Sequence, residues 1–321
     1  MLRSLVGSEM CIRDRSICHA DQRYFQGLRA TDILKQKLPM ALIHEAIGEI
    51  VWDPKGEFEA GERVVMIPNT PMEEDSVIAD NYLRTSKFRA SGFDGFMQDV
   101  VNMRRDRIVR VPRNINPFVA AFTELVSVSV HAIDRFDKIA HERRKTVGIW
   151  GDGNLGYITA IFFKAMFPEV KLCIFGLDEN KLSDFTFADD TFSITSIPDD
   201  LSIDHAFECV GGEGSPKAIN QIIDYINPEG TISILGVSEN PVAINTRMIL
   251  EKGLRMFGSS RSGRKDFEKT IALYQSNPEI VEYLQNIIGA TVNVHTVEDM
   301  KKAFELDRQN AFGKTIMIWN K

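Results

Sequence analysis

The chain has 321 residues, 44% of them hydrophobic, so it can bury a large core, and its length suggests about two domains. A net charge of −7 and a pI near 5.5 argue against a nucleic-acid surface, and no apolar run is long enough for a membrane span or a signal peptide. We therefore expect a cytoplasmic globular protein. Its four cysteines are few for this length and include no CxxC pair, which indicates reduced thiols.

Residues 1–15, MLRSLVGSEMCIRDR, show no periodicity and no helix-capping signal. The run GSEMCIRDR resembles a translated sequencing adapter, so the segment is excluded from the expected fold. The authentic sequence is then expected to begin near Ser16. The natural N-terminus would be missing, together with a first strand or strand pair, and this predicts a less stable chain.

Residues 16–67 contain apolar and β-branched runs bounded by Gly and Pro, which are typical of short strands in an irregular β-rich domain. Cys18, Asp21, His44 and Glu45 stand within these runs. A thiolate, an imidazole and a carboxylate suit zinc, and three protein ligands with an open fourth position are typical of a catalytic site. Each residue also has a structural interpretation, since a single buried Cys or His is commonly part of a core.

Residues 146–164 combine a short apolar strand with the glycine pattern Gly151-x-Gly153-x-x-Gly156 and a helical apolar spacing. Asn154 and Leu155 lie inside this pattern, at the expected start of the helix. Such a turn lets main chain approach a pyrophosphate, which the helix N-terminus attracts. The pattern predicts a dinucleotide site; the alternative is three packing glycines in another α/β protein.

The rest of the chain alternates strands and helices. Strands are expected in residues 171–176, 205–215, 229–236 and 254–260, with a helix at 217–226 between the second and third of them. Helices at 266–274, 278–288 and 297–306 and a closing strand from 314 follow. This alternation favours a parallel α/β sheet followed by a helical C-terminal part.

Four motifs together resemble the zinc-dependent medium-chain dehydrogenase/reductase family across residues 16–321. They are Cys18-x-x-Asp21, His44-Glu45-x-x-Gly48, Gly61-Glu62-Arg63-Val64 and the glycine turn at 151–156. The resemblance implies an α/β fold with a GroES-like β-rich catalytic domain at 16–133, completed by 265–321. It implies a Rossmann domain, a doubly wound parallel sheet, at 134–264.

The same resemblance implies one catalytic zinc, bound by Cys18 and His44, with Glu45 as a permanent or exchanging ligand and Asp21 orienting a ligand. Glu124 opens a segment that matches polyol dehydrogenases, which implies that it binds zinc directly or through water; the alternative is a paired buried carboxylate. Many relatives carry a hydroxyl relay two residues after the cysteine ligand, where this chain has Ala20. A water held by Glu45 or Glu124 is the proton donor we expect instead.

Many family members also bind a structural zinc through four cysteines in the region equivalent to residues 69–95. This chain has no cysteine there, and acidic residues precede basic ones in the segment. We expect a solvated loop and no structural zinc.

Cofactor preference depends on the end of the second strand, at Gly176. The family's usual basic-Leu pair aligns with Lys181-Leu182, which places Gly176 where NAD-binding chains carry an acidic residue for the ribose. The absence of that carboxylate and the charge of Lys181 favour NADPH. In the alternative register, Asp178 contacts the ribose.

The resemblance further implies reduction of D-ribulose 5-phosphate to D-ribitol 5-phosphate, which supplies CDP-ribitol for teichoic acid or capsule synthesis. Arg23 is the candidate for the substrate phosphate, unless it is an exposed surface residue. A homodimer is expected, as is association with a ribitol-phosphate cytidylyltransferase. Two alternatives stay open: an NAD-dependent, sorbitol-like zinc polyol dehydrogenase, and a nucleotide-binding protein without catalysis.

Overall fold

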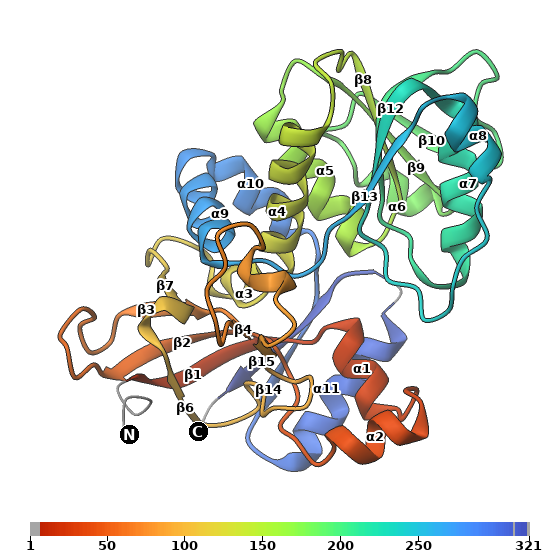
Figure 1. Cartoon of the computed structure of the whole chain (residues 1–321). Helices are drawn as coiled ribbons and strands as arrows, with labels where there is room; N and C mark the ends of the chain where they lie inside the picture. The colour runs from red at the N-terminus through yellow and green to blue at the C-terminus, as the bar shows by residue number, and fades with distance from the viewer. Residues whose placement is uncertain (1–6, 311, 320–321) are drawn as a thin grey trace. The chain divides into compact units, whose positions relative to one another are not determined.

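The computed structural model describes residues 7–310 and 312–319, and the chain divides into two compact units (Figure 1). The first unit comprises residues 1–127 and 261–321, and the second comprises residues 128–260. The first unit is therefore built from two separate stretches of sequence. None of the helices in the described ranges is long and apolar enough to cross a membrane.

The core of the first unit is a seven-stranded sheet in the order β14-β15-β1-β2-β3-β7, with β6 paired to β1. The strands are β1 (Ser8–Ser16), β2 (Glu45–Trp52), β3 (Arg63–Met66), β6 (Val100–Met103), β7 (Ile108–Arg110), β14 (Ile288–Val294) and β15 (Lys314–Trp319). All pairs are antiparallel except the parallel pair of β14 and β15. Two short strands, β4 (Asn69–Thr70) and β5 (Lys87–Phe88), form a separate ladder.

Strand β1 corrects the exclusion of residues 8–15 from the fold; residues 1–6 of that segment lie outside the described residues. β1 pairs with β15, β2 and β6, and Met10 and Ile12 are fully buried. The guanidinium of Arg15, also fully buried, lies 3.7 Å from the centre of the Trp319 ring. Hydrogen bonding to neighbouring strands on both edges of β1 makes this segment a strand, although its sequence alone does not predict one. The adapter origin of the segment stays a prediction.

Deleting residues 1–15 should abolish the cooperative unfolding of the first unit. Burial of Met10 and Ile12 alone contributes about 3–6 kcal/mol, against a total stability of roughly 5–15 kcal/mol for a domain. Thermal unfolding monitored by circular dichroism checks this, with deletion of residues 1–6 as the control that leaves β1 intact. A chain lacking residues 1–15 that melts like the full chain would contradict the assigned role of β1.

The described residues of the first unit also form helices and 3-10 turns, one of the helices being shared with the second unit. They are α1 (His19–Phe25), α2 (Thr31–Lys37), α3 (Pro117–Ala121), α4 (Thr123–Ile139), α9 (Arg264–Ser276), α10 (Pro278–Gln285), α11 (Val297–Gln309), η1 (Asp80–Tyr82) and η2 (Arg105–Arg107). Helix α4 begins in the first unit and continues into the second, since the units divide after Ser127.

Helices α1 and α2 occupy a region where the sequence analysis expects only short strands. Helix α1 is capped locally, because the main-chain N–H of Cys18 donates to Asp21 Oδ2 at 3.3 Å and the Gln22 N–H donates to the Cys18 carbonyl at 3.1 Å. Gln22 Nε2 also donates to the carbonyl of Phe304 in α11 at 2.7 Å. The helix therefore fixes the main chain at Cys18.

The second unit confirms the expected Rossmann fold, with a fully parallel sheet in the order β10-β9-β8-β11-β12-β13. Its strands are β8 (Thr146–Trp150), β9 (Lys171–Gly176), β10 (Asp190–Ser193), β11 (Ile203–Glu208), β12 (Ile226–Ile234) and β13 (Arg255–Gly258). Its remaining helices are α5 (Asn154–Met166), α6 (Glu179–Ser183), α7 (Ser215–Tyr225), α8 (Thr246–Glu251) and the 3-10 turn η3 (Gly212–Gly214).

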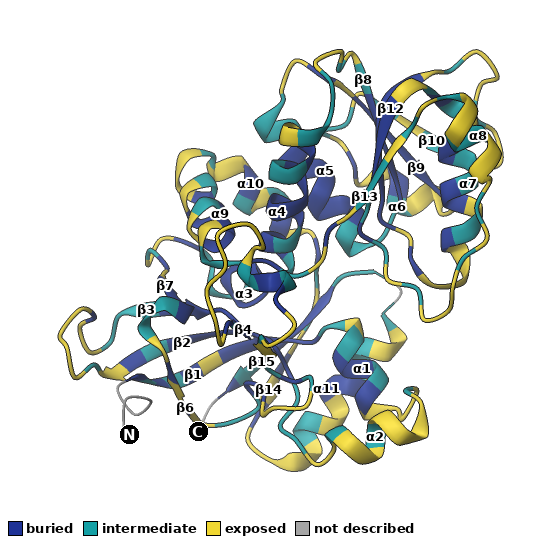
Figure 2. Cartoon of the chain, in the orientation of Figure 1, coloured by how far each residue is buried: buried dark blue, intermediate teal, exposed yellow. Residues whose placement is uncertain are grey.

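The core of the second unit lies around the central strands and helix α5, which Figure 2 shows largely in dark blue. Residues 156–163 of α5 are all buried, as are four of the five residues of β8. The rings of Trp150 and Phe175, on adjacent strands, stack with their centres 3.7 Å apart. This packing holds the turn between β8 and α5 in place.

Candidate functional site

Within the first unit, three segments bring the predicted metal ligands together. Cys18 precedes α1, His44 directly precedes β2, Glu45 is the first residue of β2, and Glu124 lies in the first turn of α4. The ligand atoms form two overlapping triads, Cys18 with Asp21 and His44, and His44 with Glu45 and Glu124. In each triad the three atoms lie within 4.8 Å of one another, so His44 is the shared member.

Asp21 holds the imidazole of His44. Asp21 Oδ2 lies 3.3 Å from His44 Nδ1, and Asp21 Oδ1 accepts the main-chain N–H of Ile43 at 2.9 Å. With Nδ1 directed at Asp21, Nε2 is the ring atom available to bind a metal, and it lies 4.0 Å from Glu124 Oε2. Burial alone would lower the pKa of His44, but Asp21 and Cys18 raise it well above its usual value. These contacts fit the predicted orienting role of Asp21.

The residue before His44 has an unusual backbone conformation. Ile43 has φ of +71°, in the left-handed region that β-branched residues rarely adopt. Its N–H bonds to Asp21, and its carbonyl accepts the N–H of Phe96 at 2.6 Å. Contacts on both sides therefore maintain a strained conformation that sets the direction of His44.

Glu45 forms a buried ion pair that sequence reasoning misses. Its Oε1 lies 3.0 Å from Nζ of Lys314, which also donates to the carbonyl of Ile17 at 2.7 Å. Burial lowers the pKa of Lys314, but Glu45 outweighs it and the net pKa is raised. The other oxygen, Oε2, is buried without a hydrogen-bond partner within the described part of the chain. A buried orphan carboxylate oxygen beside a thiol and an imidazole fits a bound zinc ion.

Glu124 is a buried carboxyl at the edge of this cluster. Burial raises its pKa to about 7; the charge of His44 opposes that shift and Glu45 reinforces it. A carboxyl in this state can hold a proton near neutral pH. The two glutamates therefore differ, since Glu45 has a lysine partner and Glu124 has none of comparable closeness in the described residues.

Within the second unit, the predicted glycine turn joins β8 to α5. Gly151 has φ of +127°, and its N–H donates to the carbonyl of Phe175 at 2.9 Å. A side chain at Gly156 would collide with the carbonyl oxygen of Gly151, so this glycine permits the close approach of helix and turn. A Cβ at Gly153 would meet no atom within 4 Å, which leaves open space at the N-terminus of α5.

Because Gly153 and Gly156 have different surroundings, we expect replacement by alanine to have different effects at the two positions. Gly153→Ala should lower the melting temperature only slightly, through the less favourable N-cap, but weaken binding of a dinucleotide, because a methyl group enters the space of the pyrophosphate. Gly156→Ala should lower the melting temperature, since it forces helix α5 away from the turn. Differential scanning calorimetry with nucleotide titrations compares them. Equal loss of stability in both variants would contradict the assignment.

A carboxylate that the sequence analysis overlooks lies beside Gly176. Asp152 Oδ2 accepts the N–H groups of Leu177 at 2.7 Å and Asp178 at 2.8 Å. A Cβ at Gly176 would lie 2.7 Å from Asp152 Oδ2, so Asp152 fills the space that an acidic side chain at 176 would enter. The available sequence signal was an acidic residue inside the glycine pattern.

The two other residues predicted near the ribose belong to helix α6. Asp178 caps this helix, since its Oδ1 accepts the N–H groups of Asn180 at 2.9 Å and Lys181 at 3.3 Å. In the alternative interpretation, in which Asp178 contacts the ribose, the same carboxylate would have to bind the ribose and cap helix α6 at once. Lys181 lies in the middle of α6.

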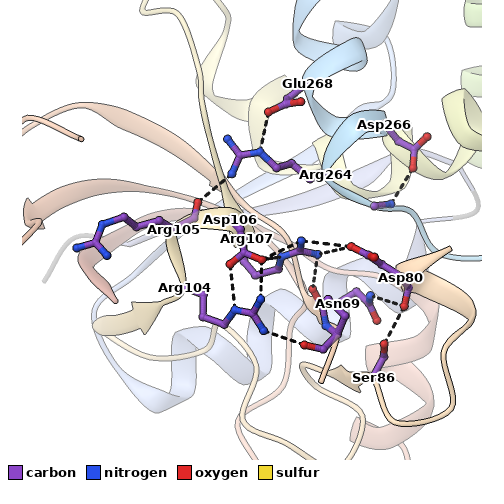
Figure 3. A network of polar contacts seen from close by, with 12 residues as sticks. Asn69, Asp80, Ser86, Arg104, Arg105, Asp106, Arg107, Arg264, Asp266 and Glu268 are labelled. Carbon is purple, nitrogen blue, oxygen red and sulfur yellow. Dashed lines mark hydrogen bonds and ion pairs between the residues drawn. The ribbon is translucent and has the colours of Figure 1, made fainter. Parts of the chain in front are cut away.

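Residues 69–95, which replace a four-cysteine lobe, contact arginines of a neighbouring segment (Figure 3). The guanidinium of Arg107, only 5% exposed, lies 3.3 Å from Asp80 and 3.0 Å from Asp106. Asn69 Nδ2 donates to the Asp80 carbonyl at 3.2 Å, and Ser86 Oγ donates to the same carbonyl at 2.7 Å. One ion pair and these hydrogen bonds therefore anchor parts of the segment, whereas residues 72–79 are exposed, as expected for a solvated loop.

Comparison with known proteins agrees with this geometry. Residues 9–113 match the alcohol dehydrogenase GroES-like domain, and residues 183–276 match the zinc-binding dehydrogenase domain. Ribulose-5-phosphate reductase 2 of Staphylococcus aureus is 56% identical over 304 residues, covering 95% of this chain and 89% of that protein. The reductase of Bacillus spizizenii is 53% identical with the same coverage.

A solved structure gives the same result. The crystal structure of S. aureus TarJ in complex with NADPH has a TM-score of 0.88 and 49% sequence identity, covering 98% of this chain and 92% of that one. The resemblance to zinc-dependent medium-chain dehydrogenases is thereby confirmed, as is the fold class. The chain belongs to the zinc-binding alcohol dehydrogenase family, in the branch that contains the ribulose-5-phosphate reductases.

Proposed function

We propose that this chain reduces D-ribulose 5-phosphate to D-ribitol 5-phosphate with NADPH. The observation that carries the proposal is the cluster of Cys18, His44, Glu45 and Glu124, with Asp21 orienting the imidazole. It occurs in a chain 53–56% identical to ribulose-5-phosphate reductases. The product would supply CDP-ribitol for teichoic acid or capsule synthesis.

Cys18 and His44 would hold one zinc ion, with Glu45 Oε2 or Glu124 as a further ligand. When bound, zinc supplies a Lewis acid that polarises the substrate carbonyl, and NADPH supplies the hydride. Asp21 keeps Nε2 of His44 directed into the cluster. Lys314 balances the charge of Glu45 in a buried setting where an unpaired carboxylate would be costly.

The reduced oxygen needs a proton, and Ala20 cannot relay one. The carboxyl of Glu45 is held by Lys314, whereas the carboxyl of Glu124 can carry a proton near neutral pH. We expect a water held by Glu45 or Glu124 to supply the proton for the product hydroxyl, and Glu124 is favoured because Lys314 pairs with Glu45.

The glycine turn would receive the pyrophosphate of NADPH, with Asn154 and Leu155 contributing N–H groups at the start of α5. Gly176 and Lys181 would accommodate the 2′-phosphate. Cytoplasmic location, a homodimer, association with a ribitol-phosphate cytidylyltransferase and the absence of a structural zinc belong to the same proposal.

One observation favours a second candidate, an NAD-dependent polyol dehydrogenase. Asp152 places a carboxylate beside Gly176, close to where NAD-binding chains carry their ribose-binding acid. This observation concerns only the choice between NADH and NADPH. It does not affect the assignment of the candidate zinc ligands.

Product analysis tests the proposed function. The zinc-loaded chain, incubated with D-ribulose 5-phosphate and NADPH, should form D-ribitol 5-phosphate in equal amount to the NADP⁺ released, as measured by chromatography and nicotinamide absorbance. Chelation of zinc should stop the reaction while nucleotide binding continues. Nucleotide binding without turnover of any ketose or polyol, phosphorylated or free, would instead favour a non-catalytic binding protein.

A further inference from the structure

Beside the candidate zinc ligands of the first unit lies Arg261, to which the sequence analysis assigns no role. The guanidinium carbon of Arg261 lies 4.7 Å from the centre of the Phe88 ring, and that ring lies 5.5 Å from the ring of His44. We propose that Arg261 binds the phosphate group of the substrate. The proposal rests on the proposed function, because it names the residue that selects a phosphorylated ketose.

A second set of contacts fixes the main chain next to Arg261. The hydroxyls of Ser262 and Ser127 lie 2.7 Å apart, and Ser127 Oγ donates to the carbonyl of Glu124 at 2.6 Å. Ser262 is buried, so this chain of hydrogen bonds holds its neighbour against the turn of α4 that carries Glu124. Phe88 and Ser262 therefore place Arg261 at the edge of the cluster by independent routes.

Among the residues that the structure describes, none is a close anionic partner of the Arg261 guanidinium. Burial lowers its pKa, and the more distant charge of Glu124 opposes that shift. Across residues 7–310 and 312–319, no hydrogen bond or ion pair is found for its side chain. Arg264, three residues later, instead pairs with Glu268 at 2.7 Å and donates to the Arg105 carbonyl at 3.0 Å (Figure 3).

The chemistry of the Arg261 guanidinium favours a phosphate ester as its ligand. A partly desolvated guanidinium gains most from an anion whose several oxygens match its fork of N–H donors, as those of a phosphate do. Arg261 also has φ of +57°, a conformation unfavourable for residues with a side chain. Strain of this kind persists where surrounding contacts impose it, and it is concentrated at ligand-binding positions.

The test compares phosphorylated and free ketose in one enzyme. For Arg261→Gln, we expect KM for D-ribulose 5-phosphate to rise on the order of 10- to 100-fold, because charge-assisted hydrogen bonds are lost. Turnover of unphosphorylated D-ribulose should not change, and this also shows that the variant is folded. Inorganic phosphate should compete with D-ribulose 5-phosphate in the wild type and lose that effect in the variant. Arg261→Lys should keep part of the affinity, since it retains the charge without the fork.

Two further variants make the test specific. Arg264→Gln is the matched control, and it should leave KM for both ketoses unchanged. Arg23→Gln tests the alternative arginine, which lies on α1 near Arg29. The inference is overturned if Arg261→Gln keeps the preference for the phosphorylated ketose, if only KM for NADPH changes, or if Arg23→Gln alone removes the preference. A wild type without any such preference would instead refute the proposed function.

Discussion

Replacing Cys18 by alanine should remove the bound zinc and lower kcat/KM for D-ribulose 5-phosphate by at least about 10³-fold, because polarisation of a carbonyl by a metal contributes several kcal/mol. Cys18 is the only thiol in either triad found among the described residues, so no neighbouring sulfur can replace it. Zinc content measured by atomic emission, together with steady-state kinetics, checks both parts. Nucleotide binding should persist, because the glycine turn lies in the other unit.

The control is Cys11→Ala, which removes a thiol of β1 that belongs to neither triad. It should keep full zinc content and activity. Asp21→Asn should have an intermediate effect, with metal affinity or activity reduced about 10- to 100-fold, because orienting partners of metal ligands have effects of that size. A Cys18→Ala protein that retains one zinc and normal turnover would show that the metal site has been placed wrongly.

Replacing Gly176 by aspartate alone should weaken NADPH and NADH binding together and should not produce an NAD-dependent enzyme. The new Cβ would lie 2.7 Å from the Asp152 carboxylate, which already accepts the N–H groups of Leu177 and Asp178. Two carboxylates would then compete for one space and repel each other. The pair Asp152→Ala with Gly176→Asp removes the conflict. In this double variant the ratio of NADH to NADPH affinity should rise about 10- to 100-fold, the effect of a charge-assisted hydrogen bond gained or lost.

Asp152→Asn separates charge from geometry, because the amide oxygen can still accept both N–H groups. If Asp152 acts by holding the turn, the asparagine variant should keep the wild-type preference, whereas Asp152→Ala should alter it. Dissociation constants for both nucleotides, measured by fluorescence titration, decide the matter. Simple additivity of the two single substitutions would contradict a coupling between residues 152 and 176.

Local patterns in the sequence were sufficient to predict the glycine turn and the parallel sheet. Gly151, Gly153 and Gly156 act through main-chain geometry within a few residues, so their spacing is informative without tertiary structure. The metal-binding residues were identifiable by type and order. Their partners were not: Lys314 is separated from Glu45 by 269 positions, and it appears in the sequence only as one lysine before an apolar strand.

The errors also have physical causes. Strand β1 alternates buried and more exposed residues only over Ser8–Arg13, a stretch too short to outweigh the resemblance to an adapter, and pairing with β15 and β2 on its two edges determines its structure. Helix α1 depends on a cap formed by Cys18 and Asp21, two residues that the sequence analysis assigned only to the metal site. The acidic residue inside the glycine pattern is only a weak signal for Asp152, because the position between the first two glycines carries no fixed role.

The most direct test of the proposed function is a comparison of kcat/KM for D-ribulose 5-phosphate and unphosphorylated D-ribulose, each with NADPH and with NADH, on zinc-loaded protein. We predict that the pair of D-ribulose 5-phosphate and NADPH is strongly preferred over the other three. Activity confined to NADH and unphosphorylated polyols or ketoses would contradict the proposed substrate and cofactor together.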